Sequence, residues 1–394
     1  MAHYFRIRAL SLIAGCLTGL VSSFALAEST TAESLLSQAL AEVNEQQPSQ
    51  ALNTLDRLIQ AYPHFQLAQM MRADLLYAQT NTLVQMGEQL SSKQAQSLQA
   101  EARARLTAIK QLADHQQPAY LLSAPPSWLS HVLTIDLTAS RAYLFHIDKQ
   151  QLQFKGSFYM TQGSMGAGKE KEGDKRTPIG IYRLTKPIPA QQLSPFYGAG
   201  ALPLDYPNAW DKRQQRTGHG IWLHGTPLTQ YSRPPLASDG CVVFSNDDMK
   251  LLLSQLDWSK TLVITDSNMA WKSAQDSQLS EQIGQQLESW RTHWEQQQSQ
   301  AYLAHYASDF LSQKGENKAQ WSARKQQLFA LGQAHQIQLS DLLILRYPSS
   351  ANVIITEFNQ RYQRGSKIDV ERKRLWWQQQ AQSWRIIHEE VLSN

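Results

Sequence analysis

The sequence predicts a multidomain chain with an all-α N-terminal region, a central mostly-β catalytic domain and a C-terminal α+β domain. Three observations support this organisation. Apolar residues recur at helical spacing before residue 118, and short runs alternate apolar and polar residues between 129 and 266. After residue 281, one long amphipathic helix precedes four strand-like runs. A length of 394 residues is enough for two or three domains.

The first 27 residues are typical of an export signal. Arg6 and Arg8 precede a largely apolar run from Ala9 to Phe24, and Ala25-Leu26-Ala27 has the small-x-small pattern of a cleavage site. We therefore expect a cleaved signal peptide and a periplasmic protein. An alternative, which the short apolar run disfavours, is a lipoprotein that is lipidated and retained at Cys16.

Charge and hydropathy exclude several classes of partner. The formal net charge is only +4, and the sequence has no basic block of the kind that binds nucleic acid. After the signal, no run approaches the roughly 18 apolar residues of a membrane-spanning helix. A weak attraction to anionic wall polymers is the most that the charge supports.

Residues 28–118 read as helices. Leu35, Leu36 and Ala39 begin one amphipathic repeat, Pro48 starts the next helix, and Tyr62-Pro63 ends it. The pattern resembles about one tetratricopeptide-type hairpin plus an extra helix, which is short of an array. We expect this region to pack on the domain after it; docking of other cell-wall proteins is the alternative.

Residues 129–266 read as the mostly-β domain. A meander is expected over 131–137, 141–147 and 152–160, followed by short strands at 179–184, 220–223, 241–244 and 261–265. The polar stretch 267–280 is expected to be a linker.

Residues 281–394 read as a helix over 283–306 and strands at 337–346, 351–362, 369–378 and 383–391. This order resembles cones of the nuclear transport factor 2-like fold. We expect no convergent set of ionisable residues there and therefore no cofactor. Three tryptophans are expected in the core or at the rim: Trp376, Trp377 and Trp384.

Cys241 is the only cysteine after the signal, and an unpaired thiol is a liability in an exported protein. Gly240 precedes it and permits a strained turn that lifts the thiol. His224, seventeen positions upstream, is a suitable base, and Gly225 lets a backbone carbonyl fix its tautomer. An inert buried thiol is the competing interpretation.

His224-Gly225-Thr226, followed by Ser238-x-Gly240-Cys241 and Asn246, resembles the signature of the L,D-transpeptidases of the peptidoglycan wall. The run from Thr177 to Tyr182 is similar to the Thr-Pro-x-Gly-x-Tyr element of the same family. The resemblance covers about 129–266, and the C-terminal region is similar to the tail of a subgroup that includes L,D-carboxypeptidases.

The resemblance implies Cys241 as nucleophile and His224 as base, oriented by the Gly225 carbonyl. It implies an oxyanion hole made by the N–H groups of Gly240 and Cys241. The substrate would be a peptidoglycan stem peptide, cleaved at the diaminopimelate–D-alanine bond through a thioester. An amine acceptor would give a cross-link and water a trimmed tripeptide. The remaining alternative is a non-catalytic wall-binding scaffold.

The substrate contacts are less determined. Ser238 and Asn246 are expected to brace the cysteine loop. Asp239 stands where the family usually has histidine, and Val243 where it often has arginine. Asp-Gly is a common turn pair, which favours Asp239 as a turn residue; attraction of an incoming ammonium group is the alternative. Arg233 is a candidate replacement clamp for a substrate carboxylate, although a solvated loop arginine is an equal interpretation.

Two further patterns carry little weight. Gly163 to Lys169 has phosphate-loop spacing, but Glu170 replaces the hydroxyl residue, so a mobile lid is expected instead. His219 and His224 lie across a strand and would face opposite sides, so we expect no metal site. His219 is expected to be a hydrogen-bonding neighbour of the site.

Overall fold

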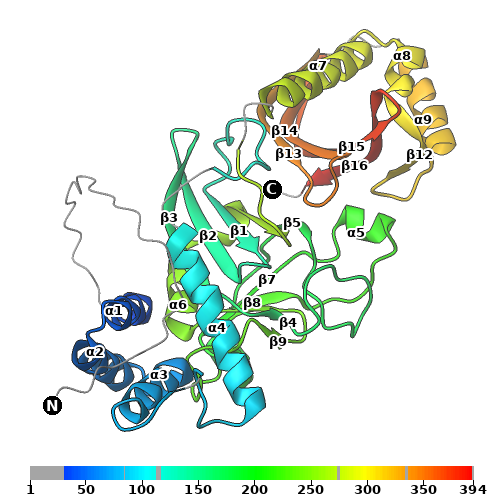
Figure 1. Ribbon diagram of the computed structural model, residues 1–394. Coiled ribbons are helices and arrows are strands. Elements are labelled where there is room, and N and C mark those ends of the chain that lie inside the picture. Colours follow the sequence, from blue (N-terminus) through cyan, green and yellow to red (C-terminus); the bar gives the residue numbers. More distant parts are fainter. Residues whose placement is uncertain (1–30, 84, 112–116, 273–275, 333–335, 393–394) are drawn as a thin grey trace.

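The computed structural model describes residues 31–83, 85–111, 117–272, 276–332 and 336–392 (Figure 1). The export signal and Cys16 lie outside these ranges. Across these ranges, no helix has both the length and the apolar character needed to cross a bilayer. The helical region and the C-terminal domain lie on different sides of the central β domain (Figure 1).

The N-terminal region is helical, as predicted. Its helices are α1 (Ala32–Asn44), α2 (Pro48–Ala61), α3 (Gln66–Tyr77) and α4 (Ser92–Gln111). Thr31 caps α1 by accepting the Ser34 N–H, and Pro48 occupies the first turn of α2, where its missing N–H has no cost. Pro118, at the end of the region expected to be helical, already forms a bridge with Trp271.

The central domain is built on two sheets, with the order β3-β2-β1-β11-β5 in the larger and β10-β8-β7-β6 in the smaller. The strands of the larger sheet are β1 (His131–Asp136), β2 (Arg141–Asp148), β3 (Gln151–Tyr159), β5 (Gly180–Arg183) and β11 (Thr261–Asp266). Those of the smaller sheet are β6 (Ile188–Pro189), β7 (Gly200–Pro203), β8 (Trp222–His224) and β10 (Val242–Val243), and β4 (Gln162–Gly163) pairs separately with β9 (Leu236–Ser238).

The two sheets share a core that includes Leu133, Leu144, Leu223, Val242 and Val263. This core holds the small sheet against the larger one. It therefore also sets the positions of the motif residues at the ends of β8, β9 and β10. Two helices in this domain were not predicted: α5 (Ala209–Arg213) and α6 (Asn246–Gln255). The short helix α6 begins after Ser245, whose hydroxyl accepts the Asp248 N–H.

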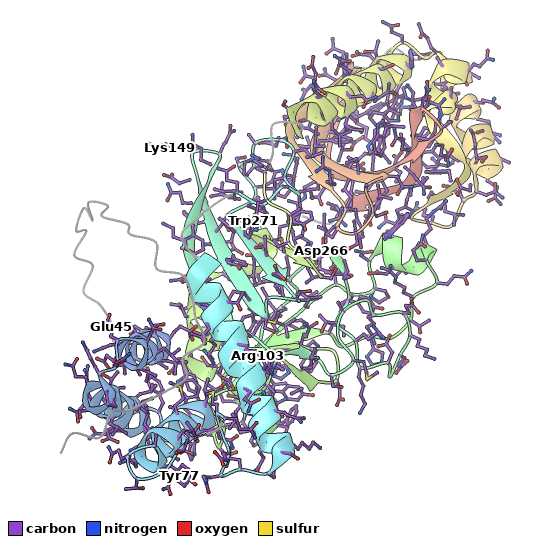
Figure 2. All side chains as sticks on the ribbon, in the orientation of Figure 1. Glu45, Tyr77, Arg103, Lys149, Asp266 and Trp271 are labelled. Carbon is purple, nitrogen blue, oxygen red and sulfur yellow. The ribbon has the colours of Figure 1, made fainter. Side chains whose placement is uncertain are left out.

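The C-terminal domain is a curved sheet of order β12-β16-β15-β14-β13 with helices around it (Figure 1). Its elements are α7 (Asp276–Glu295), α8 (Ser299–Ala304), β12 (Tyr306–Ser312), α9 (Lys318–Ala330), β13 (Gln336–Arg346), β14 (Val353–Arg364), β15 (Lys367–Gln380) and β16 (Ser383–Leu392). Figure 2 shows the side chains of this domain gathered around the curved sheet. Trp376, Trp377 and Trp384 are all buried, as predicted.

The stretch 267–280 is not a free linker. Lys272 N–H donates to Gln117 O at 2.8 Å, Trp271 bridges Pro118, and the chain is already helical at Asp276 in α7. Asp266 and Trp271 mark this junction in Figure 2. The aromatic ring of Trp271 packs on Tyr143, and this contact holds the segment on the central domain although the residues around Trp271 are polar.

Buried ion pairs join the central domain to the cone. Arg183 on β5 pairs with Glu357 on β14 at 2.6 Å, and Glu357, fully buried, also accepts from Arg374 on β15 at 2.8 Å. Main-chain bonds run from Arg346 N to Tyr120 O at 2.8 Å and from Leu122 N to Ile344 O at 2.9 Å. Because buried charges need their partners, this junction resists separation.

The helical region is joined to the central domain by a second buried cluster. Glu33 on α1 pairs with Arg105 on α4 and with Arg141 on β2. Both guanidinium groups are almost fully buried, and their charges lower the pKa of Glu33 although burial opposes them. The expected packing of the helices on the central domain is therefore present.

Candidate active site

Cys241 follows a turn between β9 and β10 that Ser238 closes. The Ser238 hydroxyl accepts the Gly240 N–H at 3.1 Å and donates to the Cys241 carbonyl at 2.6 Å. Gly240 has φ +124°, and a Cβ there would lie 2.8 Å from the Arg176 carbonyl. The turn therefore requires glycine. Thr177 holds its other side by donating to Gly240 O at 3.0 Å.

The Cys241 thiol lies against the chain that enters β8. Its sulfur accepts the Trp222 N–H at 3.4 Å and donates to Gly220 O at 3.4 Å. Burial raises the pKa of Cys241, the Trp222 N–H opposes the rise, and the Asp239 carboxylate adds to it. The resting group is consequently a neutral thiol at neutral pH.

His224 is held as a neutral imidazole. Its Nδ1 lies 2.7 Å from Gly225 O, and because a carbonyl only accepts, Nδ1 carries the proton and Nε2 keeps its lone pair. Burial lowers the pKa of His224 to about 4, with the charge of Arg233 contributing. The predicted role of the Gly225 carbonyl as orienter matches this geometry.

Strand pairing brings the two groups to one place. β8 and β10 are parallel, with Val242 opposite Leu223 and Val243 opposite His224. One step further along the register, Cys241 stands beside Trp222, whose side chain shares a strand face with His224. The Tyr197 ring contacts both of these side chains, at 5.0 Å in each case. Among the described residues, no hydrogen bond joins the sulfur to the imidazole; the sulfur is hydrogen-bonded to the main chain of Gly220 and Trp222.

Asn246 braces the histidine turn rather than the cysteine loop. Its amide donates to Thr226 O at 2.8 Å and its oxygen accepts the Ala199 N–H at 2.8 Å. A Cβ on Gly225 would lie 2.2 Å from that oxygen. Ser238 does brace the cysteine loop, as expected. Both side chains use their polar atoms inside the fold.

Gly240 does not fit the predicted oxyanion role in this structure. Its N–H already donates to Ser238 Oγ. A donor that is used inside the turn cannot also stabilise a developing oxyanion without a change of partner. The resemblance implies two N–H donors for the oxyanion, and of these only the N–H of Cys241 stays available.

Arg233 lies beside the catalytic pair. Its guanidinium stacks 4.5 Å above the ring of Phe196, which in turn lies 6.1 Å from the His224 ring. Burial lowers the pKa of Arg233, while the charges of Cys241 and Asp239 oppose the shift. Among the described residues, no carboxylate lies within ion-pair distance of this guanidinium. It is a half-buried cation without a counter-ion, which suits it to bind a carboxylate.

Asp239 and His219 are exposed at the edge of the site. The side chain of Asp239 is 86% exposed, 3.5 Å from Lys175 Nζ, and that of His219 is 83% exposed, 3.7 Å from Glu172. The contact of His219 is with Glu172, and its role as a hydrogen-bonding neighbour of the site stays a prediction. The glycines that flank it, Gly218 and Gly220, are both at positive φ.

An aromatic wall formed by Phe196, Tyr197 and Trp222 was not predicted. The first two follow Pro195 in a single 3₁₀ turn that Ser194 caps. Ser194-Pro195 is a turn-starting signal, but nothing in the sequence indicates that this turn folds over His224.

The loop from Gly163 to Lys169 is tied down rather than free. Lys169 Nζ, buried, pairs with Asp174 at 2.8 Å, and Asp174 also accepts the N–H groups of Glu170 and Arg176 at 2.8 and 3.1 Å. These bonds replace the expected mobile lid with an ordered loop. They also neutralise the lysine that a phosphate would need.

The cone does contain a convergent set of ionisable residues, contrary to expectation. A cavity of about 320 Å³ is lined by Trp294, Phe329, Tyr362 and the ammonium groups of Lys325 and Lys373. Lys373 pairs with the buried Glu389 at 3.0 Å. Burial lowers the pKa of Lys325 to about 7. Among the described residues of the whole chain, no three His, Cys, Asp or Glu side chains converge as metal ligands.

Comparison with known proteins agrees with this geometry. Residues 130–265 match the model of the L,D-transpeptidase catalytic domain, and residues 282–390 match that of the Cds6 C-terminal NTF2-like domain. A comparison with curated proteins finds no match.

Two solved structures are similar to about two thirds of this chain. Bd1075 of Bdellovibrio bacteriovorus is 26% identical with a TM-score of 0.59, over 70% of this chain and 99% of its own. The helical cell shape determining protein Pgp2 of Campylobacter jejuni is 24% identical with a TM-score of 0.58, over 66% of this chain and 91% of its own, and it supports the fold. Together with the cysteine and histidine motifs, these findings show that the chain contains an L,D-transpeptidase catalytic domain followed by a C-terminal NTF2-like domain.

Proposed function

We propose that the protein is a periplasmic cysteine L,D-transpeptidase that acts on stem peptides at the bond between the L-centre of diaminopimelate and D-alanine. The observation that carries the proposal is the neutral His224, whose Nδ1 proton is fixed on Gly225 O beside the strand position of Cys241. This leaves Nε2 free to accept the thiol proton.

Acylation of Cys241 begins with the transfer of its proton to His224. His224 Nε2 takes the proton of Cys241, and the thiolate attacks the carbonyl carbon to give a tetrahedral oxyanion. The Cys241 N–H stabilises this oxyanion. Collapse breaks the peptide bond, His224 returns the proton to the leaving amine, and D-alanine departs from a thioester. Arg233 holds the carboxylate of the D-alanine, because it is the uncompensated cation beside the sulfur.

The acceptor decides between two activities. An amine from a second stem gives a cross-link, and water gives a tripeptide, which is L,D-carboxypeptidation. Asp239 favours the amine: it is exposed, and its charge acts on the Cys241 thiol, so it can attract a cationic acceptor to the thioester.

Incubation of the mature protein with tetrapeptide-bearing wall fragments, followed by mass analysis, tests the proposal. We expect cross-linked dimers and free D-alanine, and neither with Cys241→Ala. Tripeptide as the sole product would replace transpeptidation by carboxypeptidation. A Cys241→Ala variant that matches wild type in wall composition would leave only the scaffold role. A carbapenem adduct that disappears in the same variant would identify the acylated residue.

A further inference from the structure

The short segment that carries Arg233 is held by the helical region. The Tyr231 ring packs against Phe65 with centroids 4.4 Å apart and against Tyr62 at 5.1 Å. Tyr231 N–H donates to His64 O at 3.2 Å. Ser232 Oγ donates to Glu101 on α4 at 2.7 Å. The two residues before the arginine are thus bound to two separate places in the helical region, the corner between α2 and α3 and helix α4.

The same segment is held on its other side by the central domain. Tyr159 OH and Thr161 Oγ1 donate to the Arg233 carbonyl at 2.8 and 3.0 Å. Arg105 of α4 stacks 4.0 Å above the Tyr159 ring and pairs with Glu101 at 2.9 Å. One helix therefore supports both the residue before the arginine and the tyrosine that binds its carbonyl.

These contacts are buried and costly to lose. Glu101 and Arg105 are each 2% exposed, and burial raises the pKa of Glu101 although Arg105 opposes it. Pro234 and Pro235 follow the arginine and restrict its backbone further. A backbone held from both sides places a long side chain in one region, and here that region is the face of Phe196, whose ring lies 6.1 Å from the His224 ring.

We propose that the helical region is a positioning device for Arg233 and thereby sets the preference of the thiol for reactants that carry a free carboxylate. Tyr62, Phe65 and Glu101 are positioning residues in this scheme and touch no substrate. The identification of the natural carboxylate as that of a stem peptide rests on the proposed function. The placement of the Arg233 cation does not depend on that function. Bd1075 aligns over 99% of its own length but with only 70% of this chain. The remaining part of this chain therefore has no counterpart in Bd1075.

Paired alkylation of Cys241 tests the placement without any assay of turnover. Iodoacetate carries a carboxylate and iodoacetamide does not, and both form the same thioether bond with loss of iodide. In the mature full-length protein, we expect Arg233→Gln to lower the ratio of the iodoacetate rate to the iodoacetamide rate about fivefold. Ser232→Ala and Tyr62→Ala, which leave Arg233 in the chain, should each lower the ratio in the same direction. The iodoacetamide rate reports the change in thiolate fraction that follows loss of the Arg233 charge, and the ratio cancels that change.

Controls separate positioning from general damage. Tyr231→Phe keeps the ring between Tyr62 and Phe65 and should retain the wild-type ratio, as should Arg72→Ala, which removes an exposed ion pair with Asp56 in the same helical region. Ser232→Ala deletes one hydroxyl, so it tests the idea even if Tyr62→Ala does not fold.

The outcomes distinguish the two proposals. An unchanged ratio in Arg233→Gln would show that the arginine does not act on the site and would remove the clamp from the proposed function. A lowered ratio in Arg233→Gln together with wild-type ratios in Ser232→Ala and Tyr62→Ala would overturn the positioning role and leave the clamp in place. Neither outcome depends on the formation of dimer or tripeptide.

Discussion

Ser238 and Cys241 form a closed pair in which one hydroxyl satisfies both sides of the cysteine turn. It donates to the Cys241 carbonyl and accepts the N–H of the intervening Gly240. Since Ser238 is only 6% exposed, water cannot easily replace it.

Ser238→Ala should lower the free energy of unfolding by about 1–3 kcal/mol, because it leaves a buried donor and a buried acceptor without partners. Chemical denaturation measures the change. Ser254→Ala removes an exposed helical hydroxyl that bonds to Leu251 O and should cost less than about 0.5 kcal/mol. Equal losses in the two variants would show that the turn does not depend on Ser238.

The separate hydrogen bonding of Cys241 and His224 predicts a simple pH profile. Burial lowers the pKa of His224 to about 4 and raises that of Cys241, so no thiolate–imidazolium pair is expected at rest. Alkylation by iodoacetamide should therefore fall about tenfold for each pH unit below the thiol pKa. A plateau of reactivity near pH 5 would contradict this.

His224→Gln distinguishes reactivity from catalysis. It should preserve the alkylation profile, because the imidazole is not bonded to the resting sulfur. Turnover should fall by about 10²–10⁴, the usual contribution of a general base. The sign for stability follows from the same pKa: the unfolded chain binds the extra proton between about pH 6.5 and 4, so wild-type stability is lost as the pH falls through that window.

Gly225→Ala should destabilise the protein by about 1–3 kcal/mol and abolish turnover. The new Cβ would lie 2.2 Å from Asn246 Oδ1 and 2.9 Å from Ala199 N, so the brace on the histidine turn must shift. Gly284→Ala is the matched control, because a Cβ on this α7 residue meets nothing within 4 Å. It should stabilise the protein by about 0.5–1 kcal/mol. The same sign in thermal unfolding of both variants would refute the steric account.

Lys325 should make stability rise with pH. Burial lowers its pKa from 10.5 to about 7, against the attraction of Glu389 and together with the repulsion of Lys373 and Arg324. Between these values the unfolded chain holds a proton that the folded chain lacks, so the free energy of unfolding increases by up to about 1.4 kcal/mol per pH unit. Denaturation at pH 7, 8 and 9 should show a steeper rise for wild type than for Lys325→Met. The exposed Lys367→Met should keep the wild-type slope.

Local pattern predicted the parts of the fold that are long or strictly alternating. The strands of the meander and the four late strands of the cone were found because their apolar residues repeat every second position. The helices α6 and α9 were missed although both have capping signals, Ser245 with Asp248 and Asn317 with Gln320. Those capping signals are short, and the apolar residues within the two helices that follow them repeat only weakly at helical spacing.

The site residues that lie within recognisable sequence motifs were predictable. His224, Cys241, Ser238 and the glycines occur in two short runs that a turn and a strand pair bring together. The cone cluster was not predictable, because Lys373 and Glu389 meet only through the register of β15 and β16. The contacts of the helices were missed for the same reason: no pattern in α4 indicates that Glu101 binds a serine 131 residues away.

The buried contacts of Glu357 with Arg183 and Arg374 have a consequence for anything that touches both the cone and the thiol. Since these ion pairs fasten the cone to the larger sheet, any movement of its cavity relative to Cys241 must separate buried charges. Such a movement is costly, so the junction is not built as a hinge.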